Sequence, residues 1–161
     1  MKDFGLVFFA GAAVALFLIF YLAEKQRTAS IRALASRLGF HFLGAALPRS
    51  LTLSGTPFSN HSKVWNVIDG EPNGVRTIAF DCQVGSGKGS WRRTIIAIEE
   101  SVSFSNVMPL NPEMKIDSAG GWKILYRPRV PFGFRVAGLM PLEELEPYLN
   151  SVWIEARKSG Q

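Results

Sequence analysis

The sequence predicts an α+β protein, in which an N-terminal transmembrane helix precedes one mainly antiparallel β-sheet domain that ends in a C-terminal amphipathic helix. Three observations support this prediction. Residues 4–23 contain no charged side chain, and as a helix they are long enough to cross a hydrocarbon core of about 30 Å. From residue 40 onward, apolar and polar side chains alternate with the period of two that is typical of half-buried strands. Residues 141–158 then carry apolar side chains at helical spacing.

The hydrophobic pattern divides the 161 residues into a transmembrane anchor at 1–24, a juxtamembrane amphipathic helix at 25–39 and an α+β domain at 40–161. The last segment has the size of one domain with one core. The net charge of +5 and the pI near 9.7 suit a surface beside anionic lipid. Because a tethered chain already accounts for that charge, we expect no nucleic-acid partner.

A cleaved signal peptide is the alternative interpretation of residues 4–23. Their apolar block is longer than the usual core of about 7–15 residues in such a signal. Tyr21 would also place a bulky ring three residues before cleavage after Ala23, where small residues are preferred. We therefore favour a retained anchor.

The charges that flank the anchor predict its orientation. Lys2 precedes it, and four cations follow it: Lys25, Arg27, Arg32 and Arg37. Positive flanks stay in the cytoplasm, so we expect a single-pass protein of the cell inner membrane or plasma membrane with its N-terminus outside and its C-terminal domain cytoplasmic. Cys82 is the only cysteine and cannot form an internal disulfide, which is consistent with a reducing compartment.

The juxtamembrane segment 28–38 predicts an amphipathic helix. Its apolar side chains share one stripe at 3.6-residue spacing: Ile31, Leu34, Ala35 and Leu38. Gly39 supplies a residue suited to end the helix. Since residues 24–27 contain neither glycine nor proline, this helix can continue from the anchor without a break.

Seven segments of the domain are strand candidates: 40–43, 63–69, 75–84, 91–98, 102–107, 114–117 and 122–127. The third and fourth candidates read as a hairpin joined by the glycine-rich turn at 85–90. Seven strands followed by one helix is also the element order of a pleckstrin-homology-like barrel, which makes such a barrel a second possible architecture by analogy.

The closing helix at 141–158 has the clearest helical stripe of the chain: Leu142, Leu145, Leu149, Val152, Trp153 and Ala156. We expect this stripe to pack on the sheet. Pro147 lies inside the helix and predicts a kink or a break into two pieces, because proline lacks the N–H that the helical ladder needs.

Basic residues concentrate at the predicted hairpin tip, where Lys88, Arg92 and Arg93 place three cations within six residues. Each cation near an anionic surface contributes about 1 kcal/mol, so these three residues are the candidate contact with an anionic surface. The other interpretation is a solvated turn whose charges serve solubility.

No stretch carries a recognisable catalytic, cofactor or metal motif, and we assign no such site and no cofactor. Gly87-Lys88 resembles part of a phosphate-binding loop, but Cys82 stands at the first glycine position and Gly89 at the Ser/Thr position. The only histidines, His41 and His61, are not spaced as metal-ligand pairs.

Asp81 stands between Phe80 and Cys82 in a predicted strand, so its carboxylate faces away from these two apolar side chains. A cross-strand ion pair with Arg92 or Arg93 is the expected partner. We prefer this structural role for Asp81 to that of a catalytic carboxylate.

Several short motifs resemble those of an uncharacterised bacterial family of small single-pass membrane-anchored proteins: Leu38-Gly39-Phe40, Phe80-Asp81, Gly85-Ser86-Gly87-Lys88, Thr94 and Pro112-Glu113. The resemblance covers about residues 33–113, and Cys82 stands where the family has tyrosine. It implies a bacterial source and a tethered domain, and it implies no activity, cofactor or ligand.

These features favour a non-enzymatic binding or interaction module at the cytoplasmic face of the membrane. The expected partners are the lipid bilayer and either anionic lipid headgroups or a membrane protein. Gly11 and Ala15 form a small-residue pair in the anchor, which leaves a homo-oligomer open. The alternative function is an enzyme that acts on a membrane-proximal substrate.

Overall fold

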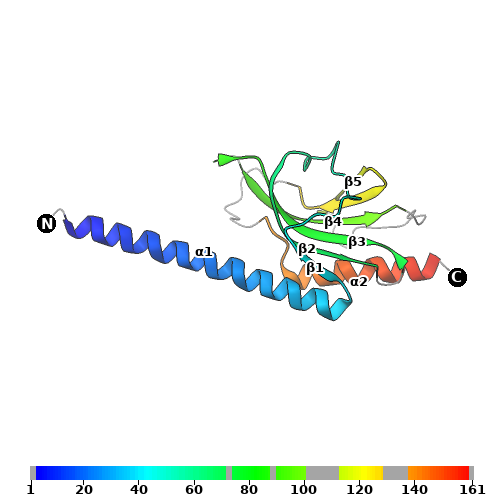
Figure 1. The fold of residues 1–161 in the computed structure, drawn as a ribbon, viewed down its shortest axis with the longest axis horizontal. Helices are drawn as coiled ribbons and strands as arrows, with labels where there is room; N and C mark the ends of the chain where they lie inside the picture. The colour runs from blue at the N-terminus through cyan, green and yellow to red at the C-terminus, as the bar shows by residue number, and fades with distance from the viewer. Residues whose placement is uncertain (1–2, 72–73, 88–89, 101–112, 129–137, 160–161) are drawn as a thin grey trace.

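Two helices and six strands make up the computed structural model, which describes residues 3–71, 74–87, 90–100, 113–128 and 138–159, with only the helical backbone described at 3–7, 10 and 151–159. The elements follow in the order α1 (Asp3–Leu38), β1 (His41–Gly44), β2 (His61–Gly70), β3 (Thr77–Val84), β4 (Trp91–Glu99), β5 (Lys115–Ala119), β6 (Trp122–Tyr126) and α2 (Leu142–Ser159) (Figure 1). The strands form one antiparallel sheet in the order β1-β2-β3-β4-β6-β5. The α+β prediction is confirmed.

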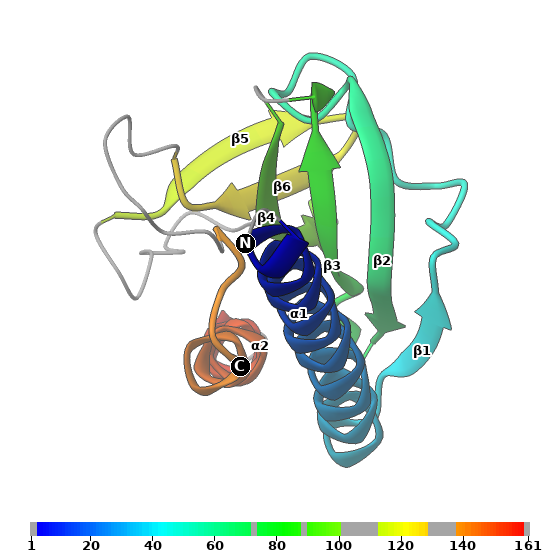
Figure 2. The ribbon, with the colours of Figure 1, turned by 90° about the vertical axis from the view of Figure 1, so that its left-hand side faces the viewer.

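Both helices lie on one face of the sheet, which arches over them (Figure 2). Side chains of α1, α2 and this face form one apolar cluster, which includes Ile31, Ile68, Ile96, Leu145 and Leu149. The opposite face packs under the loop at 45–60 and forms a second cluster, which includes Leu53, Phe58, Phe80, Cys82 and Ile95. Because both faces are covered, β3 and β4 are buried along most of their length.

The helix predicted at 28–38 is present as part of the second half of α1, which is continuous from Asp3 to Leu38. Ile31, Leu34 and Ala35 are buried against the sheet. The helix ends at Leu38 and is followed by Gly39, whose φ of 77° is readily adopted only by glycine. The Phe40 N–H then donates to the Ala35 carbonyl over 2.8 Å, which is the closing hydrogen bond of a Schellman motif.

The first half of α1 projects beyond the sheet domain (Figure 1). Its large apolar side chains are exposed by 49–76%: Phe8, Phe9, Val14, Leu16, Phe17, Leu18, Ile19, Phe20, Tyr21 and Leu22. The predicted transmembrane helix at 4–23 is not supported by the structure, because no helix, over the residues that are described, combines the length and the apolarity needed to cross a membrane.

The pleckstrin-homology-like barrel is wrong for the sheet that the structure describes. β6 pairs with β4, which leaves β5 at one edge and β1 at the other. These two edge strands do not pair with each other, so the six strands form an open sheet. The strand candidate at 102–107 lies outside the described residues.

The closing helix packs on the sheet as predicted over the residues whose side chains are described. Leu145 and Leu149 are buried, with exposed fractions of 1% and 0%, whereas Val152, Trp153 and Ala156 lie outside the described side chains. α2 stays helical on both sides of Pro147, so the predicted break into two pieces is wrong. The buried side chains before and after Pro147 hold both parts of the helix against the sheet, and this packing outweighs the lost hydrogen bond.

We expect Leu149→Ala to lower the free energy of unfolding by about 2–5 kcal/mol, because it removes a fully buried side chain from the helix-face core. Urea unfolding of the full chain in mild detergent, followed by circular dichroism, measures this loss. Asn150→Ala changes the next, exposed residue and serves as the control. Equal unfolding midpoints for the two variants would show that α2 is not part of the core.

Candidate functional site

A buried ion pair connects α1 to the middle of the sheet. The Asp81 side chain in β3 is completely buried, and the Arg27 side chain in α1 is 17% exposed. Arg27 donates from Nε to Oδ2 and from Nη2 to Oδ1 of Asp81, with both distances 2.8 Å. Two parallel charge-assisted hydrogen bonds of this kind fix orientation as well as distance. The predicted pairing of Asp81 with Arg92 or Arg93 is therefore wrong.

Two neighbouring strands supply the remaining hydrogen bonds to the carboxylate. Thr94 in β4 lies opposite Asp81 in register, and its hydroxyl donates to Oδ1 over 2.7 Å. Asn66 in β2 donates from Nδ2 to Oδ2 over 2.9 Å. Asp81 thus accepts four hydrogen bonds, which offsets the cost of burying its charge.

A β-bulge brings Asn66 to this carboxylate. Trp65 pairs with Asp81 and Ile68 pairs with Ala79, so β2 has one residue more than β3 over this stretch. Asn66 has φ = 55°, a left-handed conformation that asparagine adopts more readily than most residues. The bulge allows consecutive residues of β2 to reach the same side of the sheet.

The chain that enters α2 is tied to the same cluster. The Met140 N–H donates to Thr94 Oγ1 over 2.8 Å, and the Met140 carbonyl accepts from Arg27 Nη1 over 2.9 Å. Gly138 lies so close to β4 that an added Cβ would clash with the Arg92 carbonyl oxygen. We call Arg27, Asn66, Asp81, Thr94 and Met140 the junction cluster.

The junction cluster is closed to ligands. The crevice that runs between α1, α2 and the sheet at Asp81 has no room for a water molecule. Both oxygens of Asp81 and the hydroxyl of Thr94 already have protein partners. This arrangement therefore has a structural role, which is to hold α1, the sheet and the start of α2 in one fixed geometry.

The predicted contact residues Lys88, Arg92 and Arg93 do not form one surface over the residues described. Lys88 lies outside them. Arg92 and Arg93 are consecutive in β4, and successive strand side chains point to opposite faces. Arg93 is 8% exposed and donates to the carbonyls of Arg92 and Arg127.

Arg92 is on the helix face and meets α1. Its Nη1 lies 2.5 Å from Oε1 of Glu24, and its guanidinium carbon lies 5.3 Å from the centre of the Trp65 ring. Lys63 approaches the same ring, with Nζ 5.2 Å from its centre. These contacts surround the point where α1 leaves the domain, and the side chain of Arg92 is 38% exposed there.

Cys82 is in the core on the face opposite the helices. Burial raises the pKa of its thiol to about 12, with a smaller contribution from the charge of Asp81. The thiol therefore stays protonated and is a packed apolar side chain.

Within the described ranges, no three side chains of His, Cys, Asp or Glu lie close enough together to hold a metal ion.

Sequence reasoning missed Arg27 and Asn66 as members of the site. A signal for Arg27 exists, since it lies four residues before Ile31 on the buried stripe of α1, where a charge requires a buried partner. No comparable pattern marks Asn66, because its position depends on a bulge that the alternation of β2 does not reveal.

We expect Arg27→Met to lower the free energy of unfolding by about 3–5 kcal/mol, because it leaves the buried carboxylate of Asp81 without its charge partner. Asp81→Leu should also destabilise, and the double variant should cost less than the sum of the two single variants. Urea unfolding in mild detergent measures all three losses.

The control for this cycle is Arg37→Met, which removes the exposed ion pair with Glu146 and should cost about 0–1 kcal/mol. If Arg27→Met unfolds at the same urea concentration as Arg37→Met, the junction cluster does not stabilise the fold.

The Cys82 thiol should resist alkylation by iodoacetamide at pH 8 in the folded protein and react fully in urea, because burial raises its pKa to about 12. The cysteine introduced by Asn150→Cys in a Cys82→Ala background is the exposed control. The folded-state pKa lies above the ordinary value of 9.0, so the thiol's contribution to stability is present below pH 9 and is lost as the pH rises toward 12. Equal alkylation rates at the two positions would contradict the burial of Cys82.

The chain matches no protein-family model, no curated protein and no solved structure. The resemblance to a bacterial family of membrane-anchored proteins therefore stays a prediction.

Proposed function

We propose that this protein is a membrane-anchored, non-enzymatic interaction module, in which the apolar half of α1 lies in a lipid bilayer. The observation that carries the proposal is the row of exposed apolar side chains on a helix that continues without a break into the folded domain. Moving one such side chain from water into an apolar phase is worth about 1.5–3 kcal/mol, so this part of the helix needs an apolar environment.

The arrangement of the exposed residues favours lipid over a protein groove. Residues 16–22 are seven consecutive large apolar or aromatic side chains, and all of them are exposed. At about 3.6 residues per turn they cover every side of the helix. A protein groove covers one stripe of a helix, whereas lipid surrounds it.

The junction cluster supports the role of a fixed platform. Arg27 is held by Asp81 one helical turn after Ala23, and Glu24 is held by Arg92. The apolar part of α1 is thus followed at once by residues bonded to the sheet. A domain attached in this way keeps one orientation relative to its membrane, which suits a surface that presents itself to a partner.

The flanking charges give the proposed orientation. Lys25, Arg27, Arg32 and Arg37 follow the apolar stretch, and Lys2 precedes it, so the domain would face the cytoplasm and the N-terminus the opposite side. The proposed partners are the bilayer with its anionic headgroups or a second membrane protein.

The test is to fractionate bacterial cells that express the full chain with a reporter after Gln161. We expect the chain to stay in the membrane pellet after an alkaline carbonate wash, with a green fluorescent reporter active and an alkaline phosphatase reporter silent. Leu16→Lys/Phe20→Lys should release the chain, because charges at the centre of a membrane helix cost about 2.5–3.5 kcal/mol each. Leu16→Ile/Phe20→Leu is the matched control and should stay bound.

Release of the unmodified chain by carbonate would overturn the membrane anchor. An active phosphatase reporter on a chain that stays in the pellet would overturn the cytoplasmic orientation alone.

A further inference from the structure

Cations and aromatic rings gather where α1 leaves the sheet domain. Lys63 and Arg92 both approach the half-buried ring of Trp65, at 5.2 and 5.3 Å from its centre. Lys63 pairs with Gln83 and Gln83 pairs with Arg92, so the two cations lie in one row across three strands. Each cation is attracted electrostatically to the ring. The two positive charges, however, lie within one small surface and repel each other.

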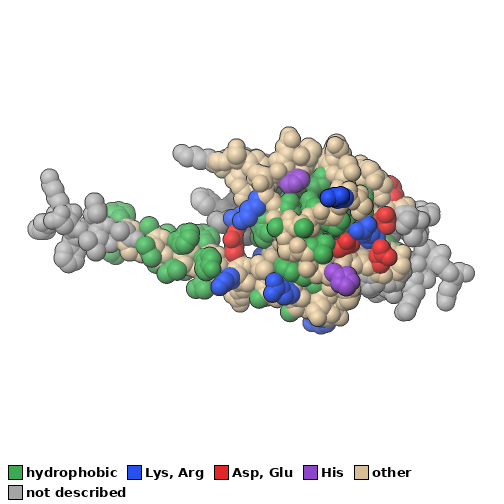
Figure 3. Space-filling model, in the orientation of Figure 1, with side chains coloured by type: hydrophobic (Ala, Val, Ile, Leu, Met, Phe, Trp, Pro, Cys, Tyr) green, Lys and Arg blue, Asp and Glu red, His purple; other side chains and the backbone are tan. Residues whose placement is uncertain are grey.

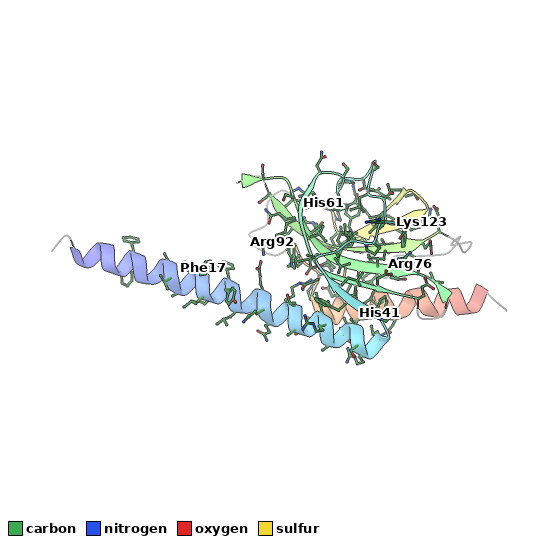
Figure 4. The ribbon with its side chains drawn as sticks, viewed as in Figure 1. Phe17, His41, His61, Arg76, Arg92 and Lys123 are labelled. Atoms are coloured by element: carbon green, nitrogen blue, oxygen red, sulfur yellow. The ribbon has the colours of Figure 1, made fainter. Side chains whose placement is uncertain are left out.

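α1 adds Glu24 to this surface at the end of its apolar stretch. Glu24 is bonded to Arg92, which places the start of β4 beside the first charged residue after Ala23. Lys25 lies two residues, or about 200° around the helix, from Arg27, so it is on the side of α1 away from the sheet, where its Nζ lies 5.3 Å from the centre of the Tyr21 ring. Figure 4 shows Arg92 on the side of the domain from which the part of α1 with Phe17 departs.

The charge of this surface is only partly balanced. Glu24 can neutralise only one of the two cations Lys63 and Arg92, and within the described part of the chain Lys63 makes no ion pair. Arg27 nearby is already matched by Asp81. Lys and Arg side chains are visible at the end of the domain that meets the apolar part of α1 (Figure 3). The surface therefore keeps a positive charge that an anion can balance.

We propose that Lys63, Trp65 and Arg92 form a headgroup site, which binds the phosphate of an anionic lipid in the membrane that holds α1. This inference rests on the proposed function, since that membrane would end where the apolar stretch of α1 ends. Tryptophan and tyrosine rings prefer this level of a bilayer, and lysine and arginine there are attracted to anionic lipid. Of the two sequence-predicted cations that the structure describes, Arg92 belongs to the headgroup site and Arg93 does not.

The position of the headgroup site favours lipid over a protein partner. The headgroup site lies directly beyond exposed apolar side chains, of which Tyr21 and Leu22 are the last. A phosphate accepts hydrogen bonds from lysine and arginine, and lipid phosphates lie at this level around the whole helix. A ligand that is already concentrated there needs only modest affinity.

The experiment measures the melting temperature of the full chain in a neutral detergent as short-chain phosphatidylglycerol is added. A ligand that binds only the folded state raises the melting temperature. We expect a rise with phosphatidylglycerol, a smaller rise at 0.5 M than at 0.05 M salt, and none with phosphatidylcholine or inorganic phosphate. Lys63→Gln/Arg92→Gln should need about 25-fold more phosphatidylglycerol for the same rise, since each cation near an anionic surface is worth about fivefold in affinity.

Arg49→Gln/Lys115→Gln removes the same charge from exposed positions elsewhere in the domain and should behave like the parent. Lys63→Gln alone, which keeps the pair between Arg92 and Glu24, should need about fivefold more lipid, and this variant decides the outcome if the double variant does not fold. The proposal is overturned if the parent does not respond to phosphatidylglycerol, if phosphate acts equally, or if the control weakens as much as the variants. Because the measurement is made in detergent, its failure leaves the fractionation test of the membrane anchor unaffected.

Discussion

The buried carboxylate of Asp81 is the constraint on which the arrangement of this protein depends. A charge that is completely removed from water is tolerated only when its partner and its hydrogen bonds are all in place. α1 supplies Arg27, the bulge of β2 supplies Asn66, and β4 supplies Thr94. The positions of three elements are thereby linked, because displacement of any one of them leaves a buried polar group unpaired.

This linkage explains how a helix that projects so far can be held by its second half alone. The apolar contacts of Ile31, Leu34 and Ala35 hold α1 against the sheet, but apolar packing alone tolerates sliding and rotation. The two parallel hydrogen bonds between Arg27 and Asp81 set one rotation and one position along the helix axis. They lie where the packed part of α1 meets the projecting part, so that a small change of angle there would move the free end most.

The helices and strands were predictable because their sequence patterns are local. The junction cluster was not predictable, since its members are distant in sequence. Alternation in β3 correctly placed Asp81 on the face opposite Phe80 and Cys82. Its partner Arg27 is 54 residues away, so the nearby Arg92 and Arg93 were the only partners that strand pairing suggested. The same alternation also separates these two arginines, which proximity in sequence had grouped into one basic surface. The pairing of β4 with β6 leaves the sheet open, with β5 at its edge. This pairing also joins strands that are not consecutive in the sequence.

Arg27 has two roles that apply at different times. As a cation directly after the apolar stretch, it adds to the charge bias that would orient a membrane helix during insertion. In the folded domain its charge is matched by Asp81 and no longer contributes to the surface. The cations that remain at this end are Lys25, Lys63 and Arg92, two of which come from the sheet and reach this position only after the domain folds. The positive surface beside the projecting helix is thus a product of folding, and the sequence next to the helix does not by itself reveal it.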